Sequence, residues 1–430
     1  MAIYTFDTMT QTDATAFAGA TDYIGFGSDS VSSIGVTDTA ATSSALGSTN
    51  ETITLTDGSH SLTFLASEIA TATSLTPEHL VFNNGDALYI GLSGSTGAPI
   101  ADTIAMTSDT AGHGAIAYGF AGDDHITANV GNDTVVGGDG DDVITGSSGS
   151  TDSHGNFTES DYYLGGAGDD LITGGNGNDH IYGNVAVGAA GSDDGNDTIN
   201  AGDGNDYVNG NAGNDQIDGG IGNDKLFGGA GNDVITGGDG NDSINGNKGE
   251  DQIDGGNGND TLHGGADNDF ITHNGAGNGQ LFGDNGDDTL VAGNGFDTLT
   301  GGAGNDLFAF NTDSALNTNV GVTGADHDHV AWVADFTSGD DVIALPITVT
   351  SVITESGATF STVQAAQNYA ETALEHDASS GEVAAITVGT DTYLFYSSTG
   401  TVDATHHIDS VIAFHGVASS VFDSDGGDFI

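Results

Sequence analysis

The chain of 430 residues carries 63 Asp and Glu against 2 Lys and no Arg, a formal net charge of −61, and it has no cysteine. Such a chain cannot neutralise nucleic-acid phosphates or an anionic bilayer, and it forms no disulfide or thiolate metal site. It also repels itself until cations compensate the charge, and no segment is apolar over the length of a membrane span.

Residues 1–118 are predicted to form a small β-domain that serves attachment or assembly. The stretch ETITLTDGSHSLTFLA has the pattern of a β-hairpin turning at Asp57-Gly58, and LVFNNGDALYIGL has the same pattern around residues 84–86. The segment that begins at Ala101 is interpreted as a degenerate first coil of the repetitive region that follows.

A nine-residue repeat, G-G-x-G-x-D-x-U-x with U large and apolar, fills residues 119–309. Eight uninterrupted units run from Ala201 to Thr272. The period breaks at 146–164, 183–200 and 273–282. The second break is two periods long and is interpreted as one degenerate coil rather than a loop.

This repeat resembles the RTX (repeats-in-toxin) calcium-binding nonapeptide family, whose fold is a calcium-bound parallel β-roll. The residue chemistry agrees, because Gly, Asn and Asp suit tight turns and each x-U-x segment makes a short strand with one inward side chain. We therefore predict an all-β protein: a parallel β-roll (RTX solenoid) flanked by the N-terminal β-domain and a C-terminal β-rich cap with one helix. The expected inward row is Ile126, Val135, Ile144, Ile172, Ile181, Ile199, Val208, Ile217, Leu226, Ile235, Ile244, Ile253, Leu262, Ile271, Leu290, Leu299 and Phe308.

The sixth position of every well-formed unit is aspartate, and these residues are the candidate ligands of multiple Ca²⁺ ions. Calcium accepts six to eight hard oxygen ligands in flexible geometry, whereas zinc prefers Cys or His and magnesium demands strict octahedral geometry. The alternative is that the aspartates only form turns; Asn at the fifth position is interpreted as a turn residue. The candidates are Asp124, Asp133, Asp142, Asp170, Asp179, Asp197, Asp206, Asp215, Asp224, Asp233, Asp242, Asp251, Asp260, Asp269, Asp288, Asp297 and Asp306.

Residues 310–430 are predicted to form a cap and assembly module, with a helix near 360–376, a hairpin over 383–397 and a last strand within 407–417. The pattern resembles the C-terminal module of secreted RTX proteins, including alphaproteobacterial surface-layer (S-layer) proteins of the Caulobacter type. This resemblance implies a calcium-dependent lattice. The final FDSDGGDFI resembles a type I secretion signal, and residues 1–30 lack the pattern of a cleavable one.

Several motifs of catalysis are absent. The sequence contains no H-E-x-x-H, no G-x-S-x-G and no Gly-Lys pair of a P-loop, so we predict that the protein is not an enzyme. The segment Asp326–His329, together with His406-His407, is a candidate transition-metal site, with a solvated loop as the favoured alternative. Four aromatic residues are predicted to pack rather than to bind sugars: Tyr118, Tyr162, Tyr163 and Trp332.

Two functions from different classes follow. The first is a secreted, non-enzymatic calcium-binding structural protein that folds on Ca²⁺ outside the cell. It would self-assemble at the bacterial cell surface into an S-layer, filament or extracellular (biofilm) matrix. The second is a calcium-dependent adhesin or glycan-binding protein, acting as a monomer through residues 1–118. Its partner would be a cell-surface polysaccharide. A toxin or hydrolase with an unrecognised site is a third alternative. None of them requires nucleic acid or membrane insertion.

Overall fold

The computed structural model describes residues 101–106, 114–149, 159–184, 195–293, 295–310, 331–337, 341–345, 349, 351–354, 360, 363–375, 382–396, 410–422 and 429, and, before residue 100, only the strands named below. It divides into two compact units, Met1–Ile221 and Gly222–Ile430. Each unit contains a parallel β-roll, and the solenoid has about 10 turns in all.

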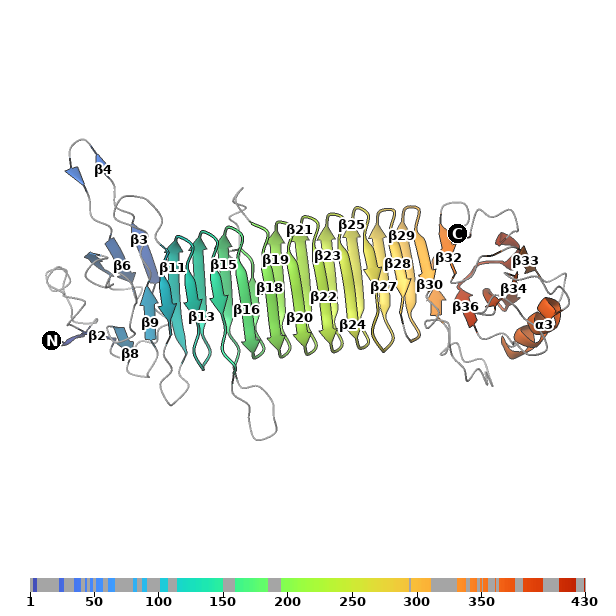
Figure 1. Ribbon diagram of the computed structural model, residues 1–430, viewed down its shortest axis with the longest axis horizontal. Coiled ribbons are helices and arrows are strands. Elements are labelled where there is room, and N and C mark those ends of the chain that lie inside the picture. The colour runs from blue at the N-terminus through green and yellow to red at the C-terminus, as the bar shows by residue number, and fades with distance from the viewer. Residues whose placement is uncertain are drawn as a thin grey trace, which may run out of the picture. The chain divides into compact units, whose positions relative to one another are not determined.

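In the first unit the roll has two parallel sheets, one of odd-numbered and one of even-numbered strands, and each strand pairs with the strand two further on (Figure 1). The odd-numbered strands are β11 (Ala115–Ala121), β13 (Thr134–Asp139), β15 (Tyr162–Ala167), β17 (His180–Tyr182) and β19 (Tyr207–Ala212). The even-numbered strands are β10 (Thr103–Ala105), β12 (His125–Thr127), β14 (Val143–Thr145), β16 (Leu171–Asn176), β18 (Thr198–Asp203) and β20 (Gln216–Ile221).

The strand β10 confirms that the chain from Ala101 forms a first coil, because Ile104 is buried and pairs in register with Ile126. Both predicted N-terminal hairpins are also present. The first joins β6 (Thr52–Thr56) to β7 (Ser61–Leu65), and the second joins β8 (Leu80–Phe82) to β9 (Ala87–Ile90). The remaining strands before the roll are β1 (Ile3–Thr5), β2 (Tyr23–Phe26), β3 (Gly35–Thr39), β4 (Ser43–Ser44) and β5 (Gly47–Ser48).

The second unit repeats the same arrangement. Its odd-numbered strands are β21 (Lys225–Ala230), β23 (Ser243–Lys248), β25 (Thr261–Ala266), β27 (Gln280–Asn285), β29 (Thr298–Ala303) and β31 (Ala331–Val333). Its even-numbered strands are β22 (Val234–Asp239), β24 (Gln252–Asn257), β26 (Phe270–Thr272), β28 (Thr289–Ala292), β30 (Leu307–Phe310) and β32 (Val342–Ala344).

The C-terminal part of the second unit contains the predicted helix and antiparallel strands. They are β33 (Ser351–Thr354), α3 (Val363–Glu375), β34 (Glu382–Val388), β35 (Asp391–Tyr396), β36 (Ser410–Phe414) and the 3₁₀-helix η4 (Ser419–Val421). The strands β34, β35 and β36 pair antiparallel, and α3 buries Ala366, Ala370 and Leu374 against them. In the described part of the chain no helix is long and apolar enough to cross a membrane.

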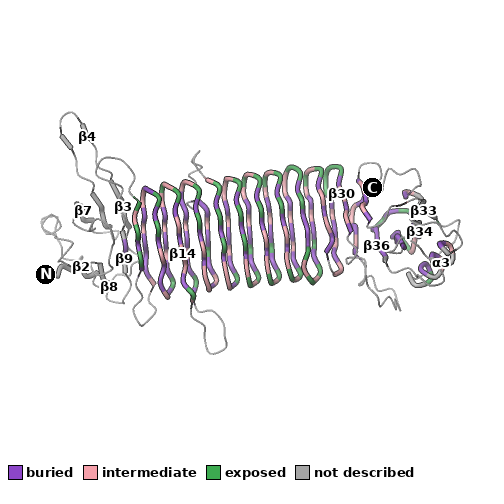
Figure 2. Tube along the Cα trace, viewed as in Figure 1, coloured by how far each residue is buried: buried purple, intermediate pink, exposed green. Residues whose placement is uncertain are grey.

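One large side chain per repeat fills each roll. Figure 2 shows how buried and less buried positions alternate along the coils. All 17 predicted inward residues are at most 1 % exposed. The structure adds further members that the repeat pattern did not include: Ile104, Tyr163, Leu281, Val333 and Ile343. Because the period of the strand is two, a single inward position per strand leaves its neighbours on either side facing outward.

The interpretation of the break at 183–200 as a degenerate coil is wrong. His180 on β17 pairs directly with Tyr207 on β19, so successive strands are three repeat periods apart instead of two. The break therefore adds one period to a single coil, and 185–194, where the added residues fall, lie outside the described residues. The break at 146–164 likewise adds ten residues between β13 and β15, and the break at 273–282 adds one between β25 and β27.

Candidate metal-binding turns

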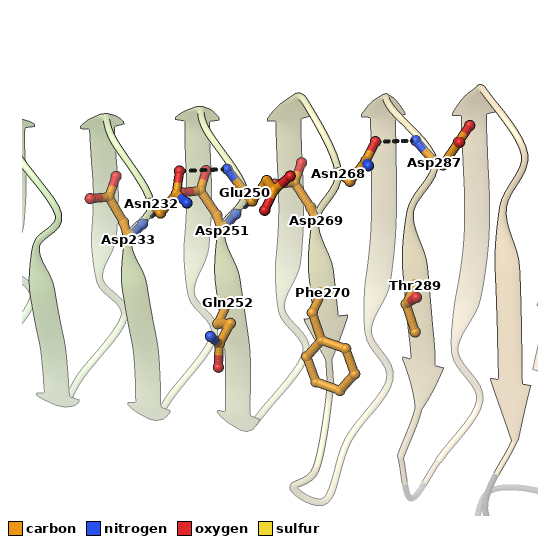
Figure 3. A pocket seen from close by; sticks show the side chains of 10 residues that line it. All are labelled: Asn232, Asp233, Glu250, Asp251, Gln252, Asn268, Asp269, Phe270, Asp287 and Thr289. Carbon is orange, nitrogen blue, oxygen red and sulfur yellow. Dashed lines mark hydrogen bonds between the residues drawn. The ribbon is translucent and has the colours of Figure 1, made fainter.

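The sixth-position aspartates stand at the turns, each immediately before a strand, and form one row along each edge of a roll. All 17 are at most 3 % exposed, although ionised carboxylates are almost never fully buried without a partner. In the second unit Asp233, Asp251 and Asp269 occupy the same place in three successive coils (Figure 3). The negative charge of these buried carboxylates must be neutralised at the turns.

One oxygen of each carboxylate has a structural role. The backbone N–H of Asp233 donates to Oδ1 of Asp251 at 2.8 Å, and the N–H of Asp251 donates to Oδ1 of Asp269 at 2.9 Å. The same bond recurs in the first unit, where Asp124 donates to Asp142. Each aspartate therefore ties its own coil to the preceding one, which supports part of the alternative that these residues serve the turn.

The second oxygen has a different environment. Oδ2 is buried and makes no hydrogen bond in a series of aspartates that includes Asp124, Asp142, Asp170, Asp179, Asp242, Asp251, Asp260, Asp269, Asp288 and Asp297. A buried acceptor that is left without a donor is costly, and the cost is larger when the group is charged. A row of such oxygens at the same repeat position suits the binding of a proton or a cation.

The first glycine of each repeat shapes the space next to Oδ2. A methyl group on Gly246 would collide with Oδ2 of Asp251 and would lie 2.7 Å from the carbonyl oxygen of Gly264. Since the same relation holds at Gly264, with Asp269 and Gly283, the carboxylate and a carbonyl of the next coil approach one point at successive turns. Glycine at Gly246 and Gly264 keeps this space open, because a side chain there would fill it.

Fifth-position residues make a second series of contacts that runs in the opposite direction. Oδ1 of Asn232 accepts from the N–H of Glu250 at 3.0 Å, and Oδ1 of Asn268 accepts from the N–H of Asp287 at 2.8 Å (Figure 3). These side chains bind the following coil, whereas the sixth-position carboxylates bind the preceding one. The interpretation of fifth-position Asn as a turn residue therefore has a specific physical basis.

Burial raises the pKa of several carboxyls in the row, among them Asp170, Asp251 and Asp288. It outweighs the backbone hydrogen bonds, which lower the pKa, and neighbouring carboxylates raise it further; the pKa reaches about 8 at Asp170 and about 7 at Asp251. At Asp288 the pKa rises to about 6 for the same leading reason. Near neutral pH a carboxyl with a pKa as high as that of Asp170 therefore holds a proton in the absence of a cation, and a cation must displace that proton.

Among the described residues no three His, Asp or Glu side chains come together as a metal cluster. A bound cation at the turns must therefore combine a carboxylate with backbone carbonyl oxygens. Such a donor set suits calcium, which accepts both kinds of oxygen in flexible geometry, and does not suit zinc. The residues present fit a calcium ion at the turns. The individual Asp ligands remain a prediction.

Two further members of the row were missed from the sequence. Asp161 accepts from the N–H of Asp133 and donates its own N–H to Asp179. Its unit, Asn156–Leu164, lacks the glycines, but Asp161 stands one repeat period before Asp170, and that spacing was a usable signal. Asp341 accepts from the N–H of Asp306, 35 residues earlier, beyond any regular period.

The remaining sequence candidates have separate environments. Tyr163 is buried and donates to Oδ2 of Asp161, and Trp332 packs edge-on against Tyr393, so both pack as predicted. Tyr118 stacks on Phe120, and Tyr162 belongs to a partly exposed ring cluster on the odd-numbered strands. The candidate site at 326–329 with 406–407, and all of the final FDSDGGDFI except Phe422 and Phe429, lie outside the described residues.

These features together define a parallel β-roll with cation-binding turns. The family profile described as the RTX calcium-binding nonapeptide repeat matches residues 118–151, 157–185, 191–226, 218–253, 236–271, 246–281 and 282–313. The repeat region thus matches the RTX calcium-binding repeat, and its aspartate rows imply Ca²⁺ binding.

Comparison with curated proteins gave no significant match. Among solved structures, the chain is similar to the solution structure of the AlgE6R3 subunit from the Azotobacter vinelandii mannuronan C5-epimerase. The identity is 22 %, the match covers 41 % of this chain and 80 % of that one, and the TM-score is 0.28. At that TM-score the similarity carries no functional argument.

Proposed function

We propose that the protein is a secreted, non-enzymatic structural protein that folds on calcium outside the cell and self-assembles at the cell surface. The observation that carries the calcium-dependent part is the row of buried Oδ2 atoms without hydrogen-bond donors, represented by Asp142, Asp251 and Asp269. Calcium would be held by these carboxylates and by carbonyls such as that of Gly264. It would supply the positive charge that lets the coils stack.

The proposed location outside the cell follows from the dependence of folding on calcium. RTX repeats are typical of extracellular proteins exported by type I secretion. A chain with a net charge of −61 stays unfolded where calcium is scarce and folds where calcium is plentiful, which suits passage through a narrow export channel. This coupling makes the bacterial cell surface or the extracellular matrix the proposed site of action.

Exposed apolar side chains on even-numbered strands, found in each of the two units, support self-assembly. At the seventh repeat position, Leu171 on β16, Val234 on β22 and Phe270 on β26 are 43–45 % exposed, although large apolar side chains are costly in water. Asp and Glu along the surface add sites that calcium can bridge between chains. With two lysines in the whole chain, assembly by direct salt bridges is a minor contribution.

Electron microscopy with calcium and with a chelator tests the assembly. We expect ordered sheets or filaments only with calcium, and we expect Phe270→Ser with Val234→Ser to abolish them while calcium-dependent circular dichroism is retained. Gln252→Ser is the matched control, because Gln252 occupies the same repeat position on β24. A calcium-folded protein that remains monomeric at all concentrations would contradict the structural role.

One observation favours the alternative of glycan binding. Tyr162, His180, Tyr182 and Tyr207 form a ring cluster on β15, β17 and β19, with centroids 5.5–6.4 Å apart, and none of the four is buried. Aromatic rings with hydroxyl groups suit stacking against sugar rings. This cluster lies on the roll, whereas the sequence suggested residues 1–118 for this role.

If the alternative holds, a calcium-loaded monomer will show saturable binding to immobilised bacterial polysaccharides, and Tyr182→Ala with Tyr207→Ala will remove it. Tyr118→Ala is the control, since Tyr118 lies on β11 and contacts Phe120 instead of the cluster. Unchanged polysaccharide binding in the double variant would exclude the ring cluster as the binding surface.

A further inference from the structure

Two members of the aspartate rows differ from the regular turns in the contact that their second oxygen makes. Oδ2 of Asp133 accepts the backbone N–H of Asn129 at 2.9 Å, and Oδ2 of Asp341 accepts the backbone N–H of Thr337 at 2.7 Å. In both cases the donor lies four residues before the aspartate, at the second position of its own repeat. One turn belongs to the first unit and the other to the second unit, so the same contact arises twice. We call these two turns the closed turns.

A regular turn uses the same N–H group differently. In the turn of Asp170 the second position is Gly166, whose N–H donates to the carbonyl oxygen of Gly183 in the next coil at 2.8 Å, and Oδ2 of Asp170 makes no hydrogen bond. Gly166 has a positive φ of 133°, whereas neither Asn129 nor Thr337 adopts a positive φ. The backbone of the closed turns therefore follows a different path, on which the second-position N–H meets the carboxylate.

The first position of the repeat is also filled in the closed turns. In the regular turn of Asp170 a methyl group on Gly165 would collide with Oδ2 and with the carbonyl oxygen of Gly183, so this glycine leaves the space beside Oδ2 open. The corresponding residues of the closed turns are Ala128, which is 7 % exposed, and Phe336, which is 6 % exposed. Each closed turn thus carries a buried side chain at the position where a regular turn has glycine.

The closed turns stand at ends of the aspartate rows. Oδ1 of Asp133 accepts the N–H of Ala115 at 2.8 Å, so the preceding coil has alanine in place of aspartate. Asp341 accepts the N–H of Asp306 and directly precedes β32, which is the last strand of the even-numbered sheet in the described part of the chain. A regular turn places a carbonyl of the next coil beside Oδ2, and a last coil has no such neighbour. A carboxylate there needs a donor from its own repeat.

We propose that the turns of Asp133 and Asp341 hold no calcium, and that the chain's own N–H groups occupy the place of the ion. The inference rests on the proposed calcium role of the regular turns. It removes Asp133 from the predicted calcium ligands and excludes Asp341 as an additional one. One row of the first unit then begins, and one row of the second unit ends, at a turn that does not depend on calcium.

The alternative is that calcium binds Asp133 through lone pairs that its hydrogen bonds leave free. The side chain of Asn129 argues against this alternative. With its amide nitrogen turned toward the carboxylate, it donates to Oδ1 at 2.9 Å and to Oδ2 at 2.7 Å. Asn129 is only 9 % exposed, so calcium would have to displace a buried donor in order to reach Asp133. A buried donor that loses its acceptor is costly.

Counting the calcium ions bound by asparagine variants tests the proposal. We expect Asp133→Asn and Asp341→Asn each to bind as many calcium ions as the unaltered protein. Asp170→Asn is the matched variant of a regular turn and should bind one ion fewer. Titration calorimetry and metal analysis after gel filtration measure these counts. Loss of an ion in Asp133→Asn or in Asp341→Asn overturns the proposal.

The double variant Ala128→Gly with Asn129→Gly tests the same assignment by a gain of binding. It restores the regular pair of glycines before Asp133, so we expect it to bind one more calcium ion per chain than the unaltered protein. An unchanged count would show that the first two positions do not keep calcium out of this turn, and the proposal would then fail.

A crystal structure of the calcium-loaded, unaltered protein requires no variant to fold. We expect anomalous scattering from calcium at about 2.3–2.6 Å from Oδ2 of Asp170, and none at that distance from Oδ2 of Asp133 or Asp341. A calcium ion on either closed turn overturns the proposal. Absence of calcium from the turn of Asp170 and from all other turns would instead contradict the proposed function.

Discussion

Removing calcium with a chelator at pH 8 is expected to unfold most of the β-roll. Each coil then retains buried carboxylates such as Asp142 and Asp251, and an uncompensated buried ion costs several kcal/mol even after relaxation. Folded domains are stable by only about 5–15 kcal/mol, so a few such turns exceed the available stability. Far-UV circular dichroism and small-angle scattering should show loss of β-structure and expansion, both reversed by calcium but not by equimolar magnesium.

Lowering the pH in the presence of chelator tests whether the charge of the buried carboxylates is what unfolds the calcium-free protein. The pKa of Asp170 rises to about 8 and that of Asp251 to about 7 in the fold, whereas an unfolded Asp titrates at about 4. Between these values the folded state binds more protons than the unfolded state, so stability rises as pH falls through this window and is lost as pH rises. The calcium-free chain should therefore regain β-structure at about pH 5.5. Full β-structure in chelator at pH 8 would contradict the calcium dependence.

Replacing Asp251 and Asp269 by asparagine is expected to separate the two roles of the carboxylate. Asparagine keeps an Oδ1 acceptor for the backbone N–H groups of positions 233 and 251, but it removes the charge that calcium requires. We expect the Asn variant to bind fewer calcium ions and yet to be more stable than the unaltered protein in chelator. The corresponding alanine variant should be less stable than the Asn variant by about 1–3 kcal/mol for each N–H left unpaired.

Calcium titration and chemical denaturation with and without chelator measure these differences. Asp239→Asn is the control, because Asp239 is exposed and its Oδ1 accepts from the side chain of Asn257. An Asn variant with the calcium stoichiometry of the unaltered protein would remove Asp251 and Asp269 from the set of ligands. Equal stabilities of the Asn and Ala variants would remove the structural role of Oδ1.

Much of the roll could be predicted because a single period sets both the hydrophobic row and the turns. Ile253, one repeat after Ile244, points inward for the same reason that Asp251 stands at the turn after Asp242. The C-terminal helix and hairpins were also predictable, since their apolar spacing and turn residues are local signals. The 17 inward residues all proved buried for this reason.

The nine-residue period did not predict the structure at the places where the repeat is interrupted. An extra period before Asp197 looks the same in sequence whether it forms half a coil or a loop, and only the pairing of His180 with Tyr207 distinguishes them. Asp161 was missed because its unit has lost its glycines.

Side chains at the fifth repeat position bind the following coil and those at the sixth position bind the preceding coil. This arrangement limits how the roll can change in length. Every coil offers the same acceptors to the coil before it and the coil after it, so adjacent coils are interchangeable at their boundaries. Gain or loss of two whole repeats preserves every inward side chain and every turn, whereas a single added repeat keeps the later strands in their sheets only if, as at 183–200, it lengthens one coil. Gene duplication can therefore lengthen this roll in whole coils, provided that a terminal carboxylate such as Asp341 still accepts the N–H of the last repeat.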